Sequence, residues 1–179
     1  EATKAEYVAL VSDVVQVDPG WLQALVSAAE SHRATAVAGT ILESDRRTVH
    51  FAGRDVSFVG LPSEPSGRQR LLYASRQSAL VRRTALIEAG GFDATFADCF
   101  EDVDLGWRLN LLGHAVVLAS DALAYRTAER SLPEGVIALR QRLVERNALA
   151  MIFKNYEDRT LEHVFPAAVA LSLLRGLIG

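Results

Sequence analysis

The sequence predicts an α/β fold, with a mixed sheet flanked by helices and two further helices at the C-terminal end. Short apolar runs of strand length recur along the chain, and segments with helical spacing of apolar residues lie between them. The 179 residues, half of them hydrophobic, are enough for one domain with a real core. We expect the sheet and its helices to occupy residues 7–125.

The N-terminal part begins with a continuous apolar run at residues 7–12, typical of a strand buried on both faces. Asp18 is predicted to cap the first helix, with Pro19 at its first helical position. Residues 36–42 form the next predicted buried strand, and residues 47–52 a third, short one.

In the middle of the chain, two prolines and a glycine predict a loop over residues 61–70. Residues 71–81 are expected to form one strand or two short ones. A short helix over residues 84–89 is predicted to end at Gly90 and Gly91.

A helix over residues 102–112, with a leucine stripe at Leu105, Leu109 and Leu112, is predicted to end at Gly113. Residues 115–119 and 122–125 are expected to be two strands.

The C-terminal helices are predicted from a capping box and an apolar run. Ser131 and Glu134 have the capping-box spacing, and the helix they open is expected to reach about Asn155. A last helix is predicted over residues 161–177. Its apolar character, interrupted by Pro166 and Arg175, suits contact with a membrane surface or with the rest of a larger protein.

Charge and cysteine content limit the function classes. With 19 basic and 22 acidic residues, the net charge of −3 gives no reason to expect nucleic acid as a partner. The single cysteine, Cys99, excludes an internal disulfide framework and favours a reducing cytoplasm. Neither end has the polar character of a natural terminus, so we expect a fragment of a longer protein.

Five carboxylates gather within twelve positions, at Asp93, Asp98, Glu101, Asp102 and Asp104. Glu101 and Asp102 fall at a helix start, where the helix dipole favours ionised carboxylates. Asp104 and Arg108 are four apart and can pair. A well-capped helix with solvated acids would also explain the cluster, whereas the spacing does not fit an EF-hand calcium loop.

The whole string from Gly90 to Gly113, with Gly-Gly-Phe-Asp followed by Glu-Asp-Val-Asp-Leu-x-x-Arg-Leu, resembles the family 2 glycosyltransferases. The rhamnosyl- and galactofuranosyl-transferase-like members are the most similar. Residues 7–22 resemble the family's strand, metal-binding turn and following helix, and residues 78–83 the strand before the Gly-Gly-Phe-Asp loop. Arg146-Asn147 and Lys154-Asn155 resemble the helix after the catalytic domain.

The resemblance implies a partial GT-A fold. Residues 1–130 would be the acceptor- and metal-side half of the catalytic domain, and residues 131–179 a C-terminal helical extension. The half that binds the nucleotide base would precede Glu1.

The resemblance also implies catalytic and metal-binding roles. Asp102 would be the general base of an inverting transfer, with Glu101 beside it, although Asp102 is also a candidate helix N-cap. Asp13 would bind a divalent Mg or Mn ion, in a motif weakened because Val11 stands where the family has a ligand.

Arg126 occupies a position where the family often has a metal-binding His. Arginine cannot bind a cation, but it pairs bidentately with phosphate. Arg126 and Arg130 are therefore predicted to contact the donor diphosphate; the alternatives are solvated surface residues or an inactive copy.

The acceptor is expected to contact Gly91, Phe92, Asp93 and Trp107. A helix C-cap followed by a core phenylalanine is compatible with this role, and Trp107 also suits a core position. The four histidines show no metal-ligand spacing, and Cys99 is taken as an inert small residue.

The implied function is transfer of a sugar from a nucleoside-diphosphate donor to a glycan or lipid-linked acceptor. Bacterial cell-envelope polysaccharide synthesis, in the cytoplasm or at the inner face of the membrane, is the expected setting. The first alternative is a degenerate member that binds a saccharide or a partner chain without chemistry. An unrelated α/β phosphotransferase is a more distant alternative, against which stands the absence of a phosphate-cradling Gly-rich loop.

Overall fold

The computed structural model describes residues 4–63, 70–97, 99–127 and 134–178. Its main sheet has the order β1-β7-β3-β8-β2, and β4 pairs with β3 beside this path. β3 and β8 run parallel, whereas the other pairs are antiparallel. The strands span Tyr7–Val11 (β1), Val15–Val17 (β2), Ala36–Leu42 (β3), Val49–Phe51 (β4), Ser78–Arg82 (β7) and Val116–Arg126 (β8). The predicted mixed α/β sheet is confirmed.

The core of the sheet is built from its apolar central strands. β3 is buried along nearly its whole length because it has a strand on either side and helices over both faces. β8 is one strand, where the sequence predicted two. Its register against β3 shifts between Gly39 and Thr40, so that the polar pair Ser120 and Asp121 is accommodated in a bulge.

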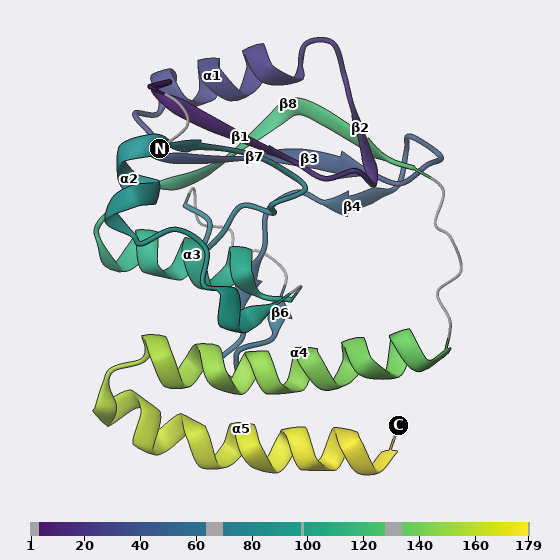
Figure 1. Ribbon diagram of the computed structural model, residues 1–179, viewed down its shortest axis with the longest axis vertical. Helices are drawn as coiled ribbons and strands as arrows, with labels where there is room; N and C mark the ends of the chain where they lie inside the picture. The colour runs from purple at the N-terminus through teal and green to yellow at the C-terminus, as the bar shows by residue number, and fades with distance from the viewer. Residues whose placement is uncertain (1–3, 64–69, 98, 128–133, 179) are drawn as a thin grey trace.

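Helices cover the sheet on both faces (Figure 1). α1 (Trp21–Ser31) lies on one face, and α2 (Arg83–Glu88) and α3 (Glu101–Leu111) lie on the other. The predicted start of α1 is wrong, because Gly20 is its N-cap. Asp18 instead forms a turn before the helix, accepting from the Gly20 N–H at 3.1 Å through its carboxylate and from the Trp21 N–H at 2.9 Å through its carbonyl.

The prediction of a strand over residues 71–81 is wrong in its first half. Only β7 (Ser78–Arg82) is a strand, and Tyr73 makes an isolated bridge to Arg54. The apolar residues of this segment are buried because α3 packs directly on its backbone. A Cβ added at Gly106 of α3 would lie 2.6 Å from the Leu72 carbonyl oxygen and 2.4 Å from the Tyr73 Cβ. In the sequence, this buried apolar run has the same pattern as a buried strand, which is why a strand was predicted.

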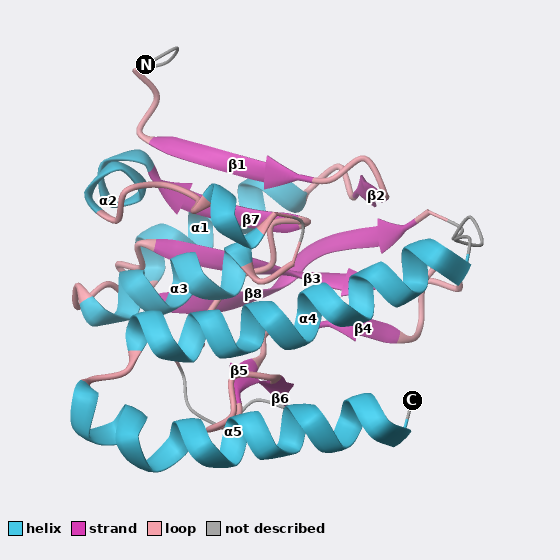
Figure 2. Cartoon of the chain, turned by 60° about the horizontal axis from the view of Figure 1, so that its bottom comes forward, coloured by secondary structure: helices cyan, strands magenta, loops and turns pink. Residues whose placement is uncertain are grey.

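The predicted pair of C-terminal helices is confirmed as α4 (Glu134–Asn155) and α5 (Asp158–Ile178), which run antiparallel beyond α3 (Figures 1 and 2). The Arg175 guanidinium pairs with the Glu145 carboxylate across them at 2.6 Å. Ser131 of the predicted capping box lies outside the described residues. In the part of the chain that the structure describes, no helix is long and apolar enough to cross a membrane.

A small hairpin, β5 (Asp55–Val56) and β6 (Pro62–Ser63), lies beside α4 (Figure 2). Its turn packs on that helix so closely that a Cβ at Gly60 would lie 2.7 Å from the Ala148 carbonyl oxygen. Part of the predicted loop 61–70 is thus a strand, and its residues 64–69 lie outside the described ranges.

Candidate active site

The start of α3 holds the candidate base in a fixed position. Phe100, not Asp102, is the N-cap, and its left-handed backbone (φ 73°) turns the chain into the helix. One Asp102 carboxylate oxygen accepts from the Val103 N–H at 2.9 Å, and the other from the Arg76 backbone N–H at 3.1 Å. Burial nevertheless raises the pKa of Asp102, the hydrogen bonds opposing this only in part. A raised pKa makes this carboxylate a stronger proton acceptor.

Glu101 is buried beside Asp102 and has a different partner. Its carboxylate pairs with the Arg76 guanidinium. Arg76 therefore contacts both acids, Asp102 through its backbone and Glu101 through its side chain. The Glu101 carboxylate is thus compensated by a cation, whereas the Asp102 carboxylate accepts from backbone N–H groups.

The Asp13 turn lies at the same end of the sheet as Asp102. The Ser12 N–H bonds the Gln77 carbonyl at 3.5 Å, and Gln77 follows Arg76, whose backbone bonds Asp102. Asp13 is exposed after β1, and its carboxylate accepts from the Ser12 hydroxyl at 3.1 Å. The connection of residues 75–77 thus joins the predicted metal turn to the candidate base.

The residues at the Asp13 turn fit a weakly held divalent ion. No group of three His, Cys, Asp or Glu side chains suited to a metal is present among the described residues. Mg²⁺, however, is often held by one or two carboxylates together with substrate phosphates and water. Asp13 can supply one such carboxylate, and a donor diphosphate would have to supply most of the other oxygens.

Arg126 at the end of β8 contacts Glu43 and His50 rather than open solvent. Its guanidinium lies 3.2 Å from the Glu43 carboxylate and 3.2 Å from His50 Nδ1, and His50 bonds Glu43 at 2.8 Å. These contacts, His50 first and then Arg126, lower the pKa of Glu43. The second predicted phosphate contact, Arg130, lies outside the described residues.

The predicted acceptor loop begins with two glycines in the left-handed backbone conformation. Gly90 and Gly91 have φ of 81° and 72°, and a Cβ at either would meet nothing within 4 Å, so glycine serves the backbone angle and not a close approach. Phe92 lines a cavity of about 10 Å³ together with Asp102, which is room for about one water molecule.

The Asp93 side chain attaches the predicted acceptor loop to α4. Its carboxylate accepts from the Thr95 N–H at 2.9 Å and from Lys154 Nζ at 2.7 Å. The bonds from Lys154 and Thr95 lower its pKa well below the ordinary range. Asp93 can still contact a sugar hydroxyl, but only as a carboxylate already held in place.

Asp104 connects α3 with α4. It is fully buried and pairs with Arg108 at 2.6 Å, as predicted, and with Lys154 at 3.0 Å and Asn155 at 3.2 Å. Arg108 also donates to the Ala89 carbonyl and, at 2.8 Å, to the Gly91 carbonyl. The acceptor loop is therefore attached to both helices.

Trp107 packs edge-on against Tyr156, with ring centroids 4.9 Å apart. This contact places it between α3 and the connection from α4 to α5. Its role in acceptor binding stays a prediction.

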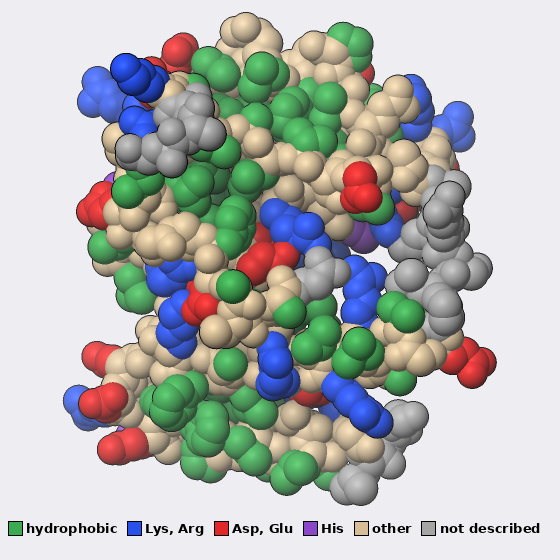
Figure 3. Space-filling model, in the orientation of Figure 1, with side chains coloured by type: hydrophobic (Ala, Val, Ile, Leu, Met, Phe, Trp, Pro, Cys, Tyr) green, Lys and Arg blue, Asp and Glu red, His purple; other side chains and the backbone are tan. Residues whose placement is uncertain are grey.

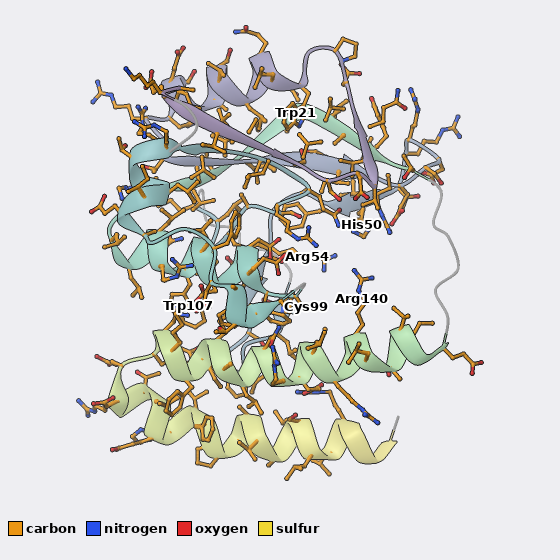
Figure 4. All side chains as sticks on the ribbon, viewed as in Figure 1. Trp21, His50, Arg54, Cys99, Trp107 and Arg140 are labelled. Carbon is orange, nitrogen blue, oxygen red and sulfur yellow. The ribbon has the colours of Figure 1, made fainter. Side chains whose placement is uncertain are left out.

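Sequence reasoning missed several residues around the site. Arg76 was unassigned because only the fold brings its connection to α3. His50 was given no role, although the antiparallel pairing of β3 with β4 brings it next to Glu43. Figure 4 shows His50, Arg54 and Arg140 around the gap between the sheet and α4.

Comparison with known proteins supports the interpretation of the fold. The chain is 33% identical to the O-antigen biosynthesis protein RfbC of Myxococcus xanthus in a match 124 residues long, and the match covers 60% of this chain and 10% of that protein. No family model matches. Among solved structures, GalNAc-T7 with UDP, GalNAc and Mn²⁺ superposes with a TM-score of 0.63 at 10% identity, over 92% of this chain and 35% of that one.

The chain therefore shares its fold with the matched part of the GalNAc-T7 structure. TarS 1–349 of S. aureus has a TM-score of 0.56 at 13% identity, over 92% of this chain and 46% of that one. The same protein in complex with UDP-GlcNAc has a TM-score of 0.57. The chain thus spans about a tenth of the curated relative and between a third and a half of the solved glycosyltransferases.

Proposed function

We propose that this chain is the acceptor- and metal-side part of an inverting, family 2-like glycosyltransferase with a GT-A fold. The observation that carries the proposal is the position of Asp102. It combines a raised pKa, two backbone hydrogen bonds that fix its carboxylate, and a place at the same end of the sheet as Asp13. A fixed carboxylate with a raised proton affinity is suited to general-base catalysis.

The donor in this proposal is a nucleoside-diphosphate sugar. Support comes from neighbours that were crystallised with UDP and Mn²⁺ or with UDP-GlcNAc. The acceptor hydroxyl would lie near Asp102, between the Phe92 face and Arg76, and lose its proton as the sugar carbon is attacked. The bond from that carbon to the diphosphate breaks, and the anomeric configuration inverts. A divalent ion at Asp13 would neutralise the leaving diphosphate.

The setting in this proposal is bacterial cell-envelope polysaccharide synthesis, in the cytoplasm or at the inner membrane face. The relative named for O-antigen biosynthesis supports it. The base-binding half of the catalytic domain would be supplied by the same protein before residue 1, and the acceptor would be a glycan or a lipid-linked glycan.

One observation favours a second candidate, a binding-only member. Val11, half exposed, replaces a metal ligand, and Arg126 is engaged with Glu43. Such a site could hold a saccharide without transferring one.

Incubating the full-length protein with a panel of nucleotide sugars and following product by NMR decides between the two candidates. We expect transfer from one donor, with inversion at the anomeric carbon. Binding of donor or saccharide without transfer in the presence of Mg²⁺ or Mn²⁺ would favour the binding-only member, and retention of configuration would contradict Asp102 as base in a single displacement.

A further inference from the structure

One face of the molecule is hollowed between the sheet and α4, and Lys and Arg side chains lie on both sides of the hollow (Figure 3). Arg54 extends into this gap from the segment between β4 and β5, and Arg140 extends into it from α4 (Figure 4). The whole chain carries a net charge of −3, so this concentration of cations does not follow from its composition.

The two arginines have little local compensation. Arg54 donates to the His50 carbonyl at 3.3 Å, and Arg140 is exposed. Within residues 4–63, 70–97, 99–127 and 134–178, no carboxylate forms an ion pair with either of them. Two guanidinium groups that extend into one hollow and form no ion pair with the described residues are suited to an oxyanion, which guanidinium groups bind bidentately.

The helix geometry places Arg140 on the side of α4 that serves the candidate active site. Arg140 precedes Asn147 by seven positions, which is about two turns, so the two share a face about 10 Å apart. The Asn147 amide donates to the carbonyls of Phe96 and Cys99, at 2.6 and 2.7 Å, just before Glu101 and Asp102.

The Arg54 side of the hollow is also connected to Asp102. The backbone of Arg54 forms an isolated β-bridge with Tyr73, whose Cα and Cβ pack on Gly106 of α3. The chain from Tyr73 leads to Arg76 beside Asp102. Burial raises the pKa of Tyr73, the charges of Asp102 and Asp55 raise it further, and the charge of Arg54 lowers it.

We propose that Arg54 and Arg140 form a binding site for an oxyanion, a phosphate or carboxylate group, on the acceptor. The inference rests on the proposed function and narrows its acceptor to an acidic or phosphate-bearing glycan. The acceptor is favoured over the donor because Arg146, Asn147 and Lys154 of the same helix hold the predicted acceptor loop and the residues that follow it. Arg54 also borders the predicted donor contact, because His50, whose carbonyl it bonds, contacts Arg126 at 3.2 Å, and the UDP arm of the test separates the two sources of the oxyanion.

The test uses glycerol 3-phosphate as the acceptor-side probe and UDP as the donor-side probe, with KCl at equal ionic strength as reference. Binding to the full-length protein, which would include the half that binds the nucleotide base, is measured by isothermal titration calorimetry. The variants are Arg140→Gln and Arg54→Gln. The control is Arg142→Gln on the same helix, which is exposed, forms no ion pair with the residues that the structure describes and lies about 200° around the helix from Arg140.

We expect Arg140→Gln and Arg54→Gln each to weaken glycerol 3-phosphate binding about tenfold, with UDP binding and the control unchanged. Equal weakening of UDP would assign the arginines to the donor diphosphate and overturn the proposal. Glycerol 3-phosphate binding no tighter than that of chloride, or equally weakened by Arg142→Gln, would also overturn it.

Failure of the proposed function gives a different pattern. If the full-length protein transfers no sugar but Arg140→Gln still weakens glycerol 3-phosphate binding, the anion site stands without the enzyme. If sugar is transferred but neither probe binding nor the KM of the acceptor changes in Arg140→Gln, the enzyme stands without the anion site.

Discussion

At the residue scale, the four described acids of the Gly90–Gly113 string, Asp93, Glu101, Asp102 and Asp104, differ in their partners. Glu101 pairs with Arg76, Asp104 with Arg108 and Lys154, and Asp93 with Lys154. Within the described residues, the Asp102 carboxylate accepts hydrogen bonds only from backbone N–H groups. This difference in partners separates the candidate base from the acids that hold the site together.

Substitution of Arg126 tests whether its guanidinium replaces part of the positive charge of a metal ion at the donor diphosphate. If it contacts the donor diphosphate, it must exchange the Glu43 carboxylate for phosphate oxygens, because Glu43 and the donor would compete for it. We predict that Arg126→Ala weakens UDP binding about tenfold and that Glu43→Gln strengthens it, both measured by calorimetry in EDTA.

The Arg126→Ala variant also tests whether sugar transfer depends on a metal ion. Transfer by the full-length protein should tolerate EDTA, and Arg126→Ala should make transfer depend on added Mg²⁺ or Mn²⁺. Complete loss of activity in EDTA together with normal activity of Arg126→Ala would show that Asp13 holds the ion without help from Arg126.

At the element scale, α4 is the support of the segment before α3. Arg146 bonds the Thr95 carbonyl at 2.8 Å, Asn147 bonds those of Phe96 and Cys99, and Lys154 pairs with Asp93 and Asp104. Because these contacts immediately precede Asp102 along the chain, the position of α4 determines the geometry of the start of α3.

We predict that Asn147→Ala lowers the free energy of unfolding by about 1–3 kcal/mol, because two backbone carbonyls lose their buried donor. Urea denaturation measures this, with the exposed Gln141→Ala on the same helix as the control. Hydrogen exchange should increase at residues 99–104 in Asn147→Ala alone. Equal stability of the two variants would show that α4 does not hold this segment.

At the scale of the whole molecule, the sequence predicts best what depends on local pattern. The apolar run of β3 identifies a strand covered on both faces, and the alternation of strands and helices identifies the α/β sheet. The bulge that makes β8 continuous and the burial of residues 71–77 under α3 depend on neighbouring elements, so local pattern misassigned both.

Sequence reasoning predicted fewer of the side-chain contacts in the site than of the elements of the fold. Asp104 and Arg108 are four apart on one helix, and their pairing was predicted. Lys154 and Asp93 are 61 positions apart, and Arg126 and Glu43 are 83 apart. Their contacts require the packed sheet and helices, and no periodicity in the chain indicates them.

The central claim, that this arrangement makes Asp102 the base of a sugar transfer, is tested most directly by the turnover of Asp102→Asn in the full-length protein. The control is Asp121→Asn, an exposed carboxylate on β8. We predict that kcat falls by on the order of a hundredfold or more in Asp102→Asn, with donor binding little changed.

The pH profile belongs to the same measurement. The wild-type rate should rise with pH through a pKa above the ordinary aspartate value of about 3.9, because burial favours the protonated acid and the base must be ionised to act. That rise should be absent from the residual activity of Asp102→Asn. Near-normal turnover in Asp102→Asn, with the acid limb of the profile unchanged, would contradict the assignment.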